Sequence, residues 1–267
     1  MQIRVLVAGA GGKMGRQVVQ AVSEAADMEL VGVVDPVFAG EDAPVYTGIV
    51  DQQQVNIQAD LPNALSLVSP DVVVDFTRPQ SVYANACTVL RAGLHMVIGT
   101  TGLTESQLQH LHELAVENKV AVVHAPNFAL GAVLMMRFAR EAAQFFPGVE
   151  IVELHHDQKK DAPSGTAIKT AEMIKETWQG SGEDPTEESR LSGARGGDLG
   201  GIHIHSVRLP GLVAHQEVLF GRPGEILTIR HDSLDRAAFM PGVLLAIRRV
   251  GSCQGLVYGL ERLMFQV

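Results

Sequence analysis

Short apolar runs recur along the first half of the chain, and segments with helical periodicity separate most of them. The first run, Ile3 to Ala8, meets a glycine cluster and is followed by apolar residues spaced as on one helix face. Four similar runs follow, at residues 29–35, 71–76, 95–100 and 120–125. Because these strands are continuously apolar, we expect a parallel sheet with helices on both faces. The first half is therefore predicted to be a Rossmann-like, doubly wound α/β domain.

The pattern changes after Pro126. A Met- and Ala-rich helix, a strand and a second helix precede a polar, glycine-rich segment, Gly180 to Gly201, which is predicted to be a mobile loop. Strand-like runs then follow without helices between them, at residues 202–208, 215–220 and 225–231. We therefore expect a dinucleotide-binding domain at 1–126 and a smaller α+β domain with a mixed sheet at 127–237. A last helix and the tail, 238–267, are expected to return to the first domain.

Composition narrows the function classes. The chain has 267 residues, 46% of them hydrophobic and 19% charged, with a formal net charge of −9, which argues against nucleic-acid or anionic-membrane partners. Cys87 and Cys253 are far apart and lack a CxxC neighbour, so we expect neither a disulfide framework nor a thiolate zinc site. Met1 to Ala8 enters a strand directly, without a signal peptide, and we find no membrane-spanning run. These features predict a cytoplasmic protein that binds small molecules.

The glycine cluster GAGGKMG, Gly9 to Gly15, lies between the first strand and a helix. Its spacing is G-x-x-G-x-x-G through Gly9, Gly12 and Gly15, and glycines there let the backbone approach a pyrophosphate at the helix start. An ordinary tight turn is the alternative. Asp35 ends the second strand about twenty residues on, where a carboxylate can accept hydrogen bonds from the adenosine ribose. Together these features favour a dinucleotide site.

Cationic and hydroxyl side chains gather in the segment ELHHDQKKDAPSGTA, Glu153 to Ala167. The segment runs from the end of a strand to a helix start, where exposed amides bind carboxylates or phosphates and Ser164 or Thr166 can cap. His156 and Lys159 would add charged donors, and His155 belongs to the residue type that transfers protons near neutrality. So many cationic and hydroxyl donors within fifteen residues predict a substrate with more than one carboxylate.

Plainer interpretations of the same residues remain open. Lys160 is expected to be an ordinary solvated lysine, and one of the two adjacent histidines can simply be packed, because neighbours in a strand face opposite ways. A metal site would require His203 and His205, which share a strand face, to meet His155. No HExxH motif or acidic third ligand accompanies them, so we expect no metal.

Five motifs are distributed along the chain. They are GAGGKMGR (residues 9–16), DFTRP (75–79), GTTG (99–102), APNF (125–128) and ELHHxxKxDAPSGTA (153–167). With these motifs in this order, the chain resembles 4-hydroxy-tetrahydrodipicolinate reductases, also called dihydrodipicolinate reductases, of bacterial lysine and diaminopimelate synthesis. The resemblance covers nearly the whole chain, and its most specific part is HHxxKxDAPSGTA.

The resemblance implies an NAD(P)H-dependent reduction of a cyclic imine dicarboxylate, with loss of the 4-hydroxyl as water. It implies that His155 is the proton donor and acceptor, Lys159 a proton donor, and His156, Gly165 and Thr166 the contacts to the substrate carboxylates. It also implies a homotetramer assembled through the second domain's sheet. The implied cofactor contacts are Gly9, Ala10, Gly11, Gly12, Lys13, Met14, Asp35, Gly99, Thr100, Thr101, Ala125, Pro126, Asn127 and Phe128.

Cofactor choice depends on a few residues near the second strand. Asp35 suits free ribose hydroxyls and repels a 2′-phosphate, and Pro36 stands where some family members carry Arg. Lys13 and Arg16 can offset part of that repulsion. We therefore expect NADH to be preferred and NADPH to be usable.

Two other functions fit parts of the pattern. An amino-acid dehydrogenase on a similar frame would share the glycine loop but would not require HHxxKxDAPSGTA. A redox-sensing protein that binds NADH without turnover would need a partner-binding or DNA-binding module, and no basic helix-turn-helix pattern is visible.

Overall fold

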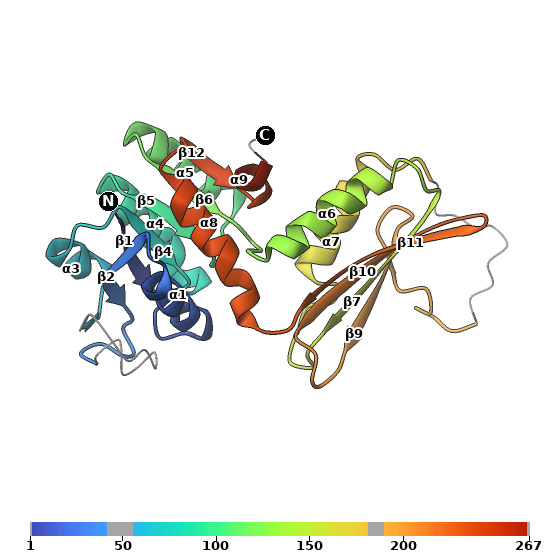
Figure 1. Cartoon of the computed structure of the whole chain (residues 1–267), viewed down its shortest axis with the longest axis horizontal. Coiled ribbons are helices and arrows are strands. Elements are labelled where there is room, and N and C mark those ends of the chain that lie inside the picture. The colour runs from blue at the N-terminus through green and yellow to red at the C-terminus, as the bar shows by residue number, and fades with distance from the viewer. Residues whose placement is uncertain (1, 42–55, 181–189, 266–267) are drawn as a thin grey trace. The chain divides into compact units, whose positions relative to one another are not determined.

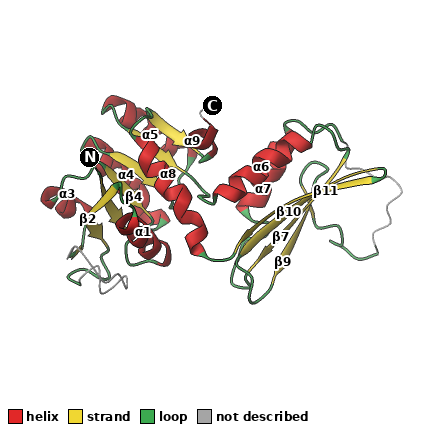
Figure 2. Cartoon of the chain, in the orientation of Figure 1, coloured by secondary structure: helices red, strands yellow, loops and turns green. Residues whose placement is uncertain are grey.

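The computed structural model of the chain describes residues 2–41, 56–180 and 190–265. It divides into two compact units, Met1–Phe128 with Phe239–Val267, and Ala129–Ala238 (Figure 1). The chain passes from the first unit to the second after residue 128 and returns after residue 238, whereas the sequence predicted these boundaries at residues 126 and 237. In each unit, helices pack against one sheet (Figure 2).

The first unit contains a parallel sheet, in the order β12-β6-β5-β4-β1-β2-β3. Its central strands are buried on both faces, since Val5, Leu6 and Val7 have no solvent exposure. The Rossmann-like fold class is therefore confirmed. The strands are β1 (Ile3–Ala8), β2 (Met28–Val34), β3 (Ile57–Gln58), β4 (Val72–Asp75), β5 (His95–Ile98), β6 (Ala121–His124) and β12 (Gly255–Tyr258).

The helices of this unit follow the apolar pattern of the sequence. Val18, Val19 and Val22 form the buried face of α1, as their spacing predicts. Thr104 and Gln107 form a capping box at the start of the helix after residue 104, in which each side chain binds the other residue's backbone amide. The helices are α1 (Lys13–Glu24), α3 (Leu61–Leu67), α4 (Pro79–Arg91), α5 (Glu105–Glu117), α8 (Met240–Val250) and α9 (Glu261–Phe265).

The edges of this sheet differ from the sequence prediction. Strand β12 pairs in parallel with β6, so the chain after the second unit completes one edge of the first unit's sheet. Neither β3 nor β12 was predicted, because β3 has only two residues and β12, with the sequence GLVY, begins at a glycine and has only two aliphatic residues. The predicted last helix begins instead as a 3-10 turn, Arg236–Phe239, and α8 has Pro241 in its first turn, where proline is tolerated.

The second unit contains a mixed sheet, in the order β11-β10-β7-β9-β8, with one parallel pair, β7 and β9, among its described strands. This confirms the predicted mixed sheet. Part of the predicted loop 180–201 forms the two-residue strand β8, and residues 181–189 lie outside the described residues. The elements are α6 (Leu130–Ala142), β7 (Gly148–His155), α7 (Gly165–Lys175), β8 (Gly197–Asp198), β9 (His203–Arg208), β10 (Ala214–Arg222) and β11 (Glu225–Ser233).

One face of this sheet packs against α6 and α7, which lie along the same side of it (Figure 1). Ile151, Val218 and Phe220 point to that face and are fully buried. The alternate residues, such as Leu154 and Leu219, are only half-buried on the opposite face. The second unit therefore has one covered and one open sheet face.

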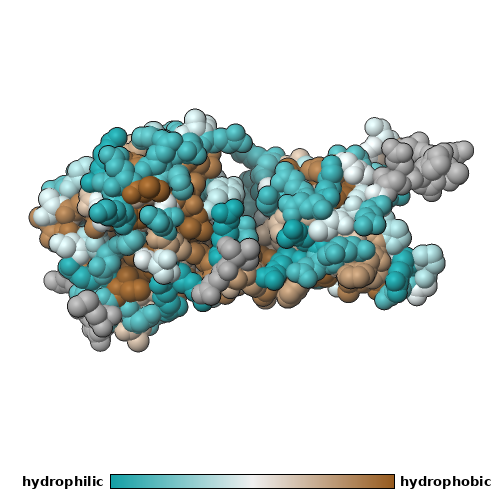
Figure 3. Space-filling model, turned by 90° about the horizontal axis from the view of Figure 1, so that it is seen from above, coloured by the Kyte–Doolittle hydropathy of each residue, from teal (hydrophilic) through white to brown (hydrophobic). Residues whose placement is uncertain are grey.

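The surface carries both hydrophilic and hydrophobic residues on each unit (Figure 3). Within the described ranges, the structure has no helix that is both long enough and apolar enough to cross a membrane.

Candidate active site

The glycine loop after β1 turns within a space that admits no side chains at two of its positions. Gly9 has φ +80°, and a Cβ there would lie 2.6 Å from the carbonyl oxygen of Phe76. A Cβ on Gly15 would lie 1.9 Å from the carbonyl oxygen of Gly9. Gly12 is the N-cap of α1 and offers no side chain to the helix amides, and the first turn has no acidic residue. The loop thus leaves the positive end of α1 open to an anion.

A cavity of about 750 Å³ adjoins this loop, a size that is typical of ligand sites. Asp35 lines it and is nearly buried, and its two carboxylate oxygens accept hydrogen bonds from the backbone N–H groups of Gly11 at 2.9 Å and Val37 at 3.0 Å. Phe38 also lines the cavity, and the guanidinium of Arg16 lies 6.0 Å from its ring centre. A carboxylate has about four acceptor positions, so Asp35 retains capacity for ribose hydroxyls. The cavity therefore fits the adenosine end of a dinucleotide.

The other two predicted cofactor segments follow neighbouring strands of the same sheet. Residues 99–101 follow β5 and residues 125–128 follow β6, and the carboxyl ends of parallel strands meet at one edge. Gly99 is required there, because a Cβ would lie 2.1 Å from the ring of Phe76. The Phe128 ring is buried, with its centre 5.8 Å from that of Phe76. The structure thus brings the predicted cofactor residues together at one edge of the first unit's sheet.

Asp75 is a buried residue of this edge to which the sequence analysis gave no role. Its carboxylate has no solvent exposure and accepts hydrogen bonds from the hydroxyls of Thr77 at 2.7 Å and Thr100 at 2.8 Å, and from the Asn85 amide at 2.8 Å. Asp75 therefore connects the loops after β4 and β5. Its position at the end of a strand, within the DFTRP motif, was the available signal.

The predicted proton-transfer and carboxylate-binding residues lie together in the second unit, from the end of β7 to the start of α7. His155 is the last residue of β7, and Gly165 and Thr166 begin α7. Ser164 caps this helix by accepting a hydrogen bond from the Ala167 N–H at 3.2 Å. His156 is half-buried in the connecting loop, where its carbonyl oxygen accepts from the Lys159 N–H at 3.2 Å.

Lys159 lies in that loop, with its side chain 22% exposed. Its Nζ donates to both carboxylate oxygens of Asp161 at 2.8 Å. This hydrogen bond from Lys159 holds the pKa of the Asp161 carboxyl below its ordinary value, although partial burial opposes the shift. The ammonium of Lys159 is thus oriented by a neighbour within the predicted site.

Glu153 is fully buried behind His155 and was not assigned a role from the sequence. Its carboxylate is held by hydrogen bonds from His155 Nδ1 at 2.5 Å, from both terminal nitrogens of Arg208 at 2.8 Å, and from the Ser164 N–H at 3.1 Å. Burial alone would raise the pKa of Glu153, but the hydrogen bonds from His155 and Arg208 outweigh it and lower this pKa to about 2. Glu153 is therefore a carboxylate near neutral pH.

Two of the three histidines considered for a metal site have carboxylate partners. His205 Nε2 binds a carboxylate oxygen of Glu150 at 2.5 Å, and His155 binds Glu153. Across the described part of the chain, no group of three or more His, Cys, Asp or Glu residues could hold a metal ion.

Comparisons with known proteins decide the family. Residues 3–128 match the family model described as dihydrodipicolinate reductase, N-terminus, and residues 131–264 match the one described as dihydrodipicolinate reductase, C-terminus. The chain belongs to the dihydrodipicolinate reductase family. Its members are NAD(P)H-dependent oxidoreductases, so the resemblance and the enzyme class predicted from the sequence are confirmed.

Individual relatives match over their full length. A 4-hydroxy-tetrahydrodipicolinate reductase from Syntrophomonas wolfei is 52% identical over 262 residues, which cover 98% of each chain. The 4-hydroxy-tetrahydrodipicolinate reductase from Synechocystis is 51% identical over 270 residues, which again cover 98% of each chain. A dipicolinate-bound dihydrodipicolinate reductase from Paenisporosarcina has a TM-score of 0.86 at 46% identity, and the match covers 98% of this chain and 99% of that one.

A more distant solved structure shares the fold alone. GenD2 from gentamicin A biosynthesis, solved in complex with NAD, has a TM-score of 0.65 at 16% identity, with 98% of this chain and 90% of that one covered.

Proposed function

We propose that the chain reduces 4-hydroxy-tetrahydrodipicolinate to tetrahydrodipicolinate with loss of water, as a cytoplasmic enzyme of lysine and diaminopimelate biosynthesis. The observation that carries the proposal is the cluster His155, Lys159, Gly165 and Thr166, folded into one strand-loop-helix of the second unit. Full-length relatives at about half identity bear the corresponding name.

The roles of the second unit's residues follow from their chemistry. The start of α7 at Gly165 and Thr166 presents backbone amides to a carboxylate, and His156 adds a donor. His155 and Lys159 carry protons that can be delivered to the substrate as the imine is reduced. The dipicolinate-bound relative supports a planar dicarboxylate as the type of ligand.

The first unit would hold the dinucleotide. Residues 9–14 and the start of α1 are suited to bind the pyrophosphate, and Asp35 is suited to bind the ribose. Residues 99–101 and 125–128 lie along the rest of this sheet edge, where they can contact the remainder of the dinucleotide. The bound nicotinamide supplies the hydride. The protein's own contribution is to orient both partners and to provide the proton.

A coupled assay tests the proposed reaction. The purified chain is mixed with the synthase that makes the unstable substrate, and NADH consumption is followed by absorbance at limiting chain concentration. We expect a rate proportional to the concentration of this chain, and no NADH formation when the chain is given NAD⁺ with aspartate or diaminopimelate in place of the synthase reaction. Activity on either amino acid alone would indicate an amino-acid dehydrogenase instead.

We expect NADH to be preferred over NADPH by roughly 3- to 30-fold in kcat/KM. The Asp35 carboxylate faces the cavity and would repel a 2′-phosphate, and Arg16 is engaged with the Gly11 carbonyl oxygen at 3.2 Å and with Phe38. Steady-state kinetics with both cofactors at matched ionic strength measures the ratio. Asp35→Asn, which removes the charge with little change in shape, should lower the ratio of kcat/KM for NADH to that for NADPH. Equal efficiencies in the unmodified enzyme would show that Lys13 and Arg16 outweigh Asp35.

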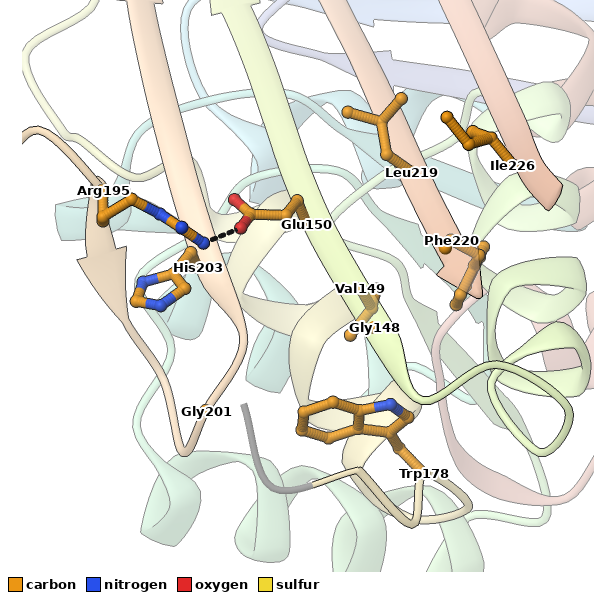
Figure 4. Close-up of a pocket in the computed structure, with 11 residues that line it drawn as sticks. Gly148, Val149, Glu150, Trp178, Arg195, Gly201, His203, Leu219, Phe220 and Ile226 are labelled. Atoms are coloured by element: carbon orange, nitrogen blue, oxygen red, sulfur yellow. Dashed lines mark hydrogen bonds and ion pairs between the residues drawn. The ribbon is translucent and has the colours of Figure 1, made fainter. Parts of the chain in front are cut away.

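We also propose that the open sheet face of the second unit is the contact surface of a homotetramer. Ile226 is 76% exposed on this face, and Leu154 and Leu219 are half-buried on the same face. A cavity of about 400 Å³ opens at the same sheet, with Arg195 directed at Glu150, and with His203 and Trp178 at its border (Figure 4). A sheet face that carries both apolar side chains and charged ones suits a second copy of the same chain, because the self-complementary pairing of a symmetric oligomer can bury the apolar groups and pair the charges.

The oligomer proposal predicts that Ile226→Asp shifts the sedimenting mass from a tetramer to smaller species. An aspartate at this position would be buried in the contact without a partner. Leu67→Asp is the matched control, since Leu67 is 63% exposed on α3 in the first unit. Analytical ultracentrifugation should separate the two variants. Equal masses for Ile226→Asp and the unmodified chain would contradict the proposal.

A further inference from the structure

Glu153 and His155 occupy one face of β7, two residues apart, so the carboxylate lies behind the imidazole. Their hydrogen bond runs from His155 Nδ1 to Glu153 Oε2 at 2.5 Å, with the His155 side chain 14% exposed and Glu153 fully buried. The proposed reaction assigns a proton to His155 but does not say which ring nitrogen carries it or what sets the ring's orientation. The geometry around Glu153 answers both questions.

The protonation state of Glu153 determines the tautomer of His155. A carboxylate has no proton to donate, so the hydrogen in the Glu153–His155 contact must sit on Nδ1. Nε2 is then the atom that gains and loses a proton, and in the neutral ring it carries the lone pair. The pKa of Glu153, about 2, keeps this arrangement at every pH near neutrality.

Arg208 holds the carboxylate in one orientation. Its NH1 and NH2 groups donate to the two oxygens of Glu153 at 2.8 Å each, a bidentate geometry that fixes the plane of the carboxylate. Arg208 lies opposite His155 in the parallel pairing of β7 and β9. The two strands therefore fix the positions of all three side chains.

The same ion pair also anchors the loop and helix that follow β7. Arg208 NH2 donates to the Asp161 carbonyl oxygen at 2.6 Å, and the Ser164 N–H donates to Glu153 Oε1 at 3.1 Å. Asp161 follows Lys159 by two residues, and Ser164 directly precedes the Gly165–Thr166 helix start. One buried pair thus sets the relative positions of the proton-carrying histidine, the lysine loop and the anion-binding helix start.

We propose that Glu153, held by Arg208, is a positioning residue of this enzyme: it fixes His155 as the Nδ1–H tautomer, so that proton exchange takes place at Nε2. The inference rests on the proposed function, because it assumes that His155 exchanges a proton with the substrate. A purely structural ion pair would support the fold without affecting the tautomer or the chemical step.

Glu153→Gln is the decisive variant, because it keeps the side chain's shape but lets the amide either donate or accept. We expect kcat to fall at least about 10-fold, since a general acid contributes ~10²–10⁴-fold when correctly oriented. KM for NADH should stay unchanged, as the cofactor residues belong to the first unit. Thr177→Val is the matched control, because it breaks a hydrogen bond of the same unit, from the Thr177 hydroxyl to the Arg140 carbonyl oxygen at 2.7 Å, beyond the end of α7 that is farther from Ser164. It should leave kcat within about 2-fold.

A second measurement does not depend on turnover. In ¹⁵N-labelled protein with the His155 ring in its neutral form, NMR should show Nδ1 protonated and Nε2 unprotonated in the unmodified chain. The signal is identified among ten histidines by its loss in His155→Asn. In Glu153→Gln, the Nε2-protonated form should gain population. If the coupled assay showed no reduction of the substrate, the proposed function would fail while this tautomer result still stood.

The removal of one charge from a buried pair can prevent folding, so a second variant keeps the proposal testable. Glu153→Gln with Arg208→Met removes both charges and leaves no uncompensated ion. If Glu153→Gln does not fold, a lowered kcat and a shifted tautomer in the double variant support the proposal. A normal kcat or an unchanged Nδ1–H tautomer in whichever variant folds would overturn it.

Discussion

Lys159→Ala and His155→Ala are each expected to lower kcat by ~10²–10⁴-fold, the usual contribution of a general acid group. Lys159 and His155 lie in the same strand-loop segment of the second unit, and each has a fixed neighbour that orients its proton-carrying group. Cofactor binding should be nearly intact, because the dinucleotide residues belong to the first unit. Steady-state kinetics, with NADH affinity measured separately by fluorescence titration, checks both parts.

The control for this prediction is Lys160→Ala. Lys160 follows Lys159 directly but is exposed, so its removal should change kcat by less than about 2-fold. The His155→Ala protein should still fold, because Glu153 retains its bidentate pair with Arg208. A near-normal kcat in the Lys159→Ala, His155→Ala double variant would exclude both assignments.

Gly15→Ala should destabilise the first unit by about 3 kcal/mol, at the upper end of what overpacking usually costs. Alanine stabilises a helix by about 1 kcal/mol relative to glycine, so helix propensity alone would predict that Gly15→Ala is stabilising. The added Cβ would, however, lie 1.9 Å from the Gly9 carbonyl oxygen and 2.9 Å from the Ala10 Cα, and backbone atoms cannot rotate away. Urea unfolding, monitored by circular dichroism, measures the difference.

Gly12→Ala is the matched change in the same loop. Gly12 has φ −69° and ψ 165°, which any residue can adopt, and a Cβ there would lie 3.4 Å from its nearest neighbour, the Gly9 carbonyl oxygen. Its stability should therefore stay within about 0.5 kcal/mol of the unmodified chain. Because Gly12 lines the cavity, its Cβ should instead raise KM for NADH. If Gly15→Ala were as stable as Gly12→Ala, the close contact at Gly15 would not constrain the fold.

The sequence predicted those parts of the fold that depend on neighbours in the chain. The continuously apolar runs predicted the buried parallel strands, and the spacing of Val18, Val19 and Val22 predicted the buried face of α1. Thr104 and Gln107 form their capping box within one helical turn, so the local sequence was sufficient to predict it. The short strands β3 and β12 carry no such local signal, since pairing with a neighbouring strand defines them.

The sequence by itself also determined the family and the class of reaction, because HHxxKxDAPSGTA is a contiguous segment. A strand end, a loop and a helix start keep their donors close to one another wherever the unit's other elements lie. The residues that orient those donors required the tertiary structure. Arg208 is 55 positions from Glu153 and reaches it only because β9 pairs with β7, and Thr100 reaches Asp75 across neighbouring strands. Burial then requires each carboxylate to find its donors, and strand pairing, which local sequence does not encode, decides which residues supply them.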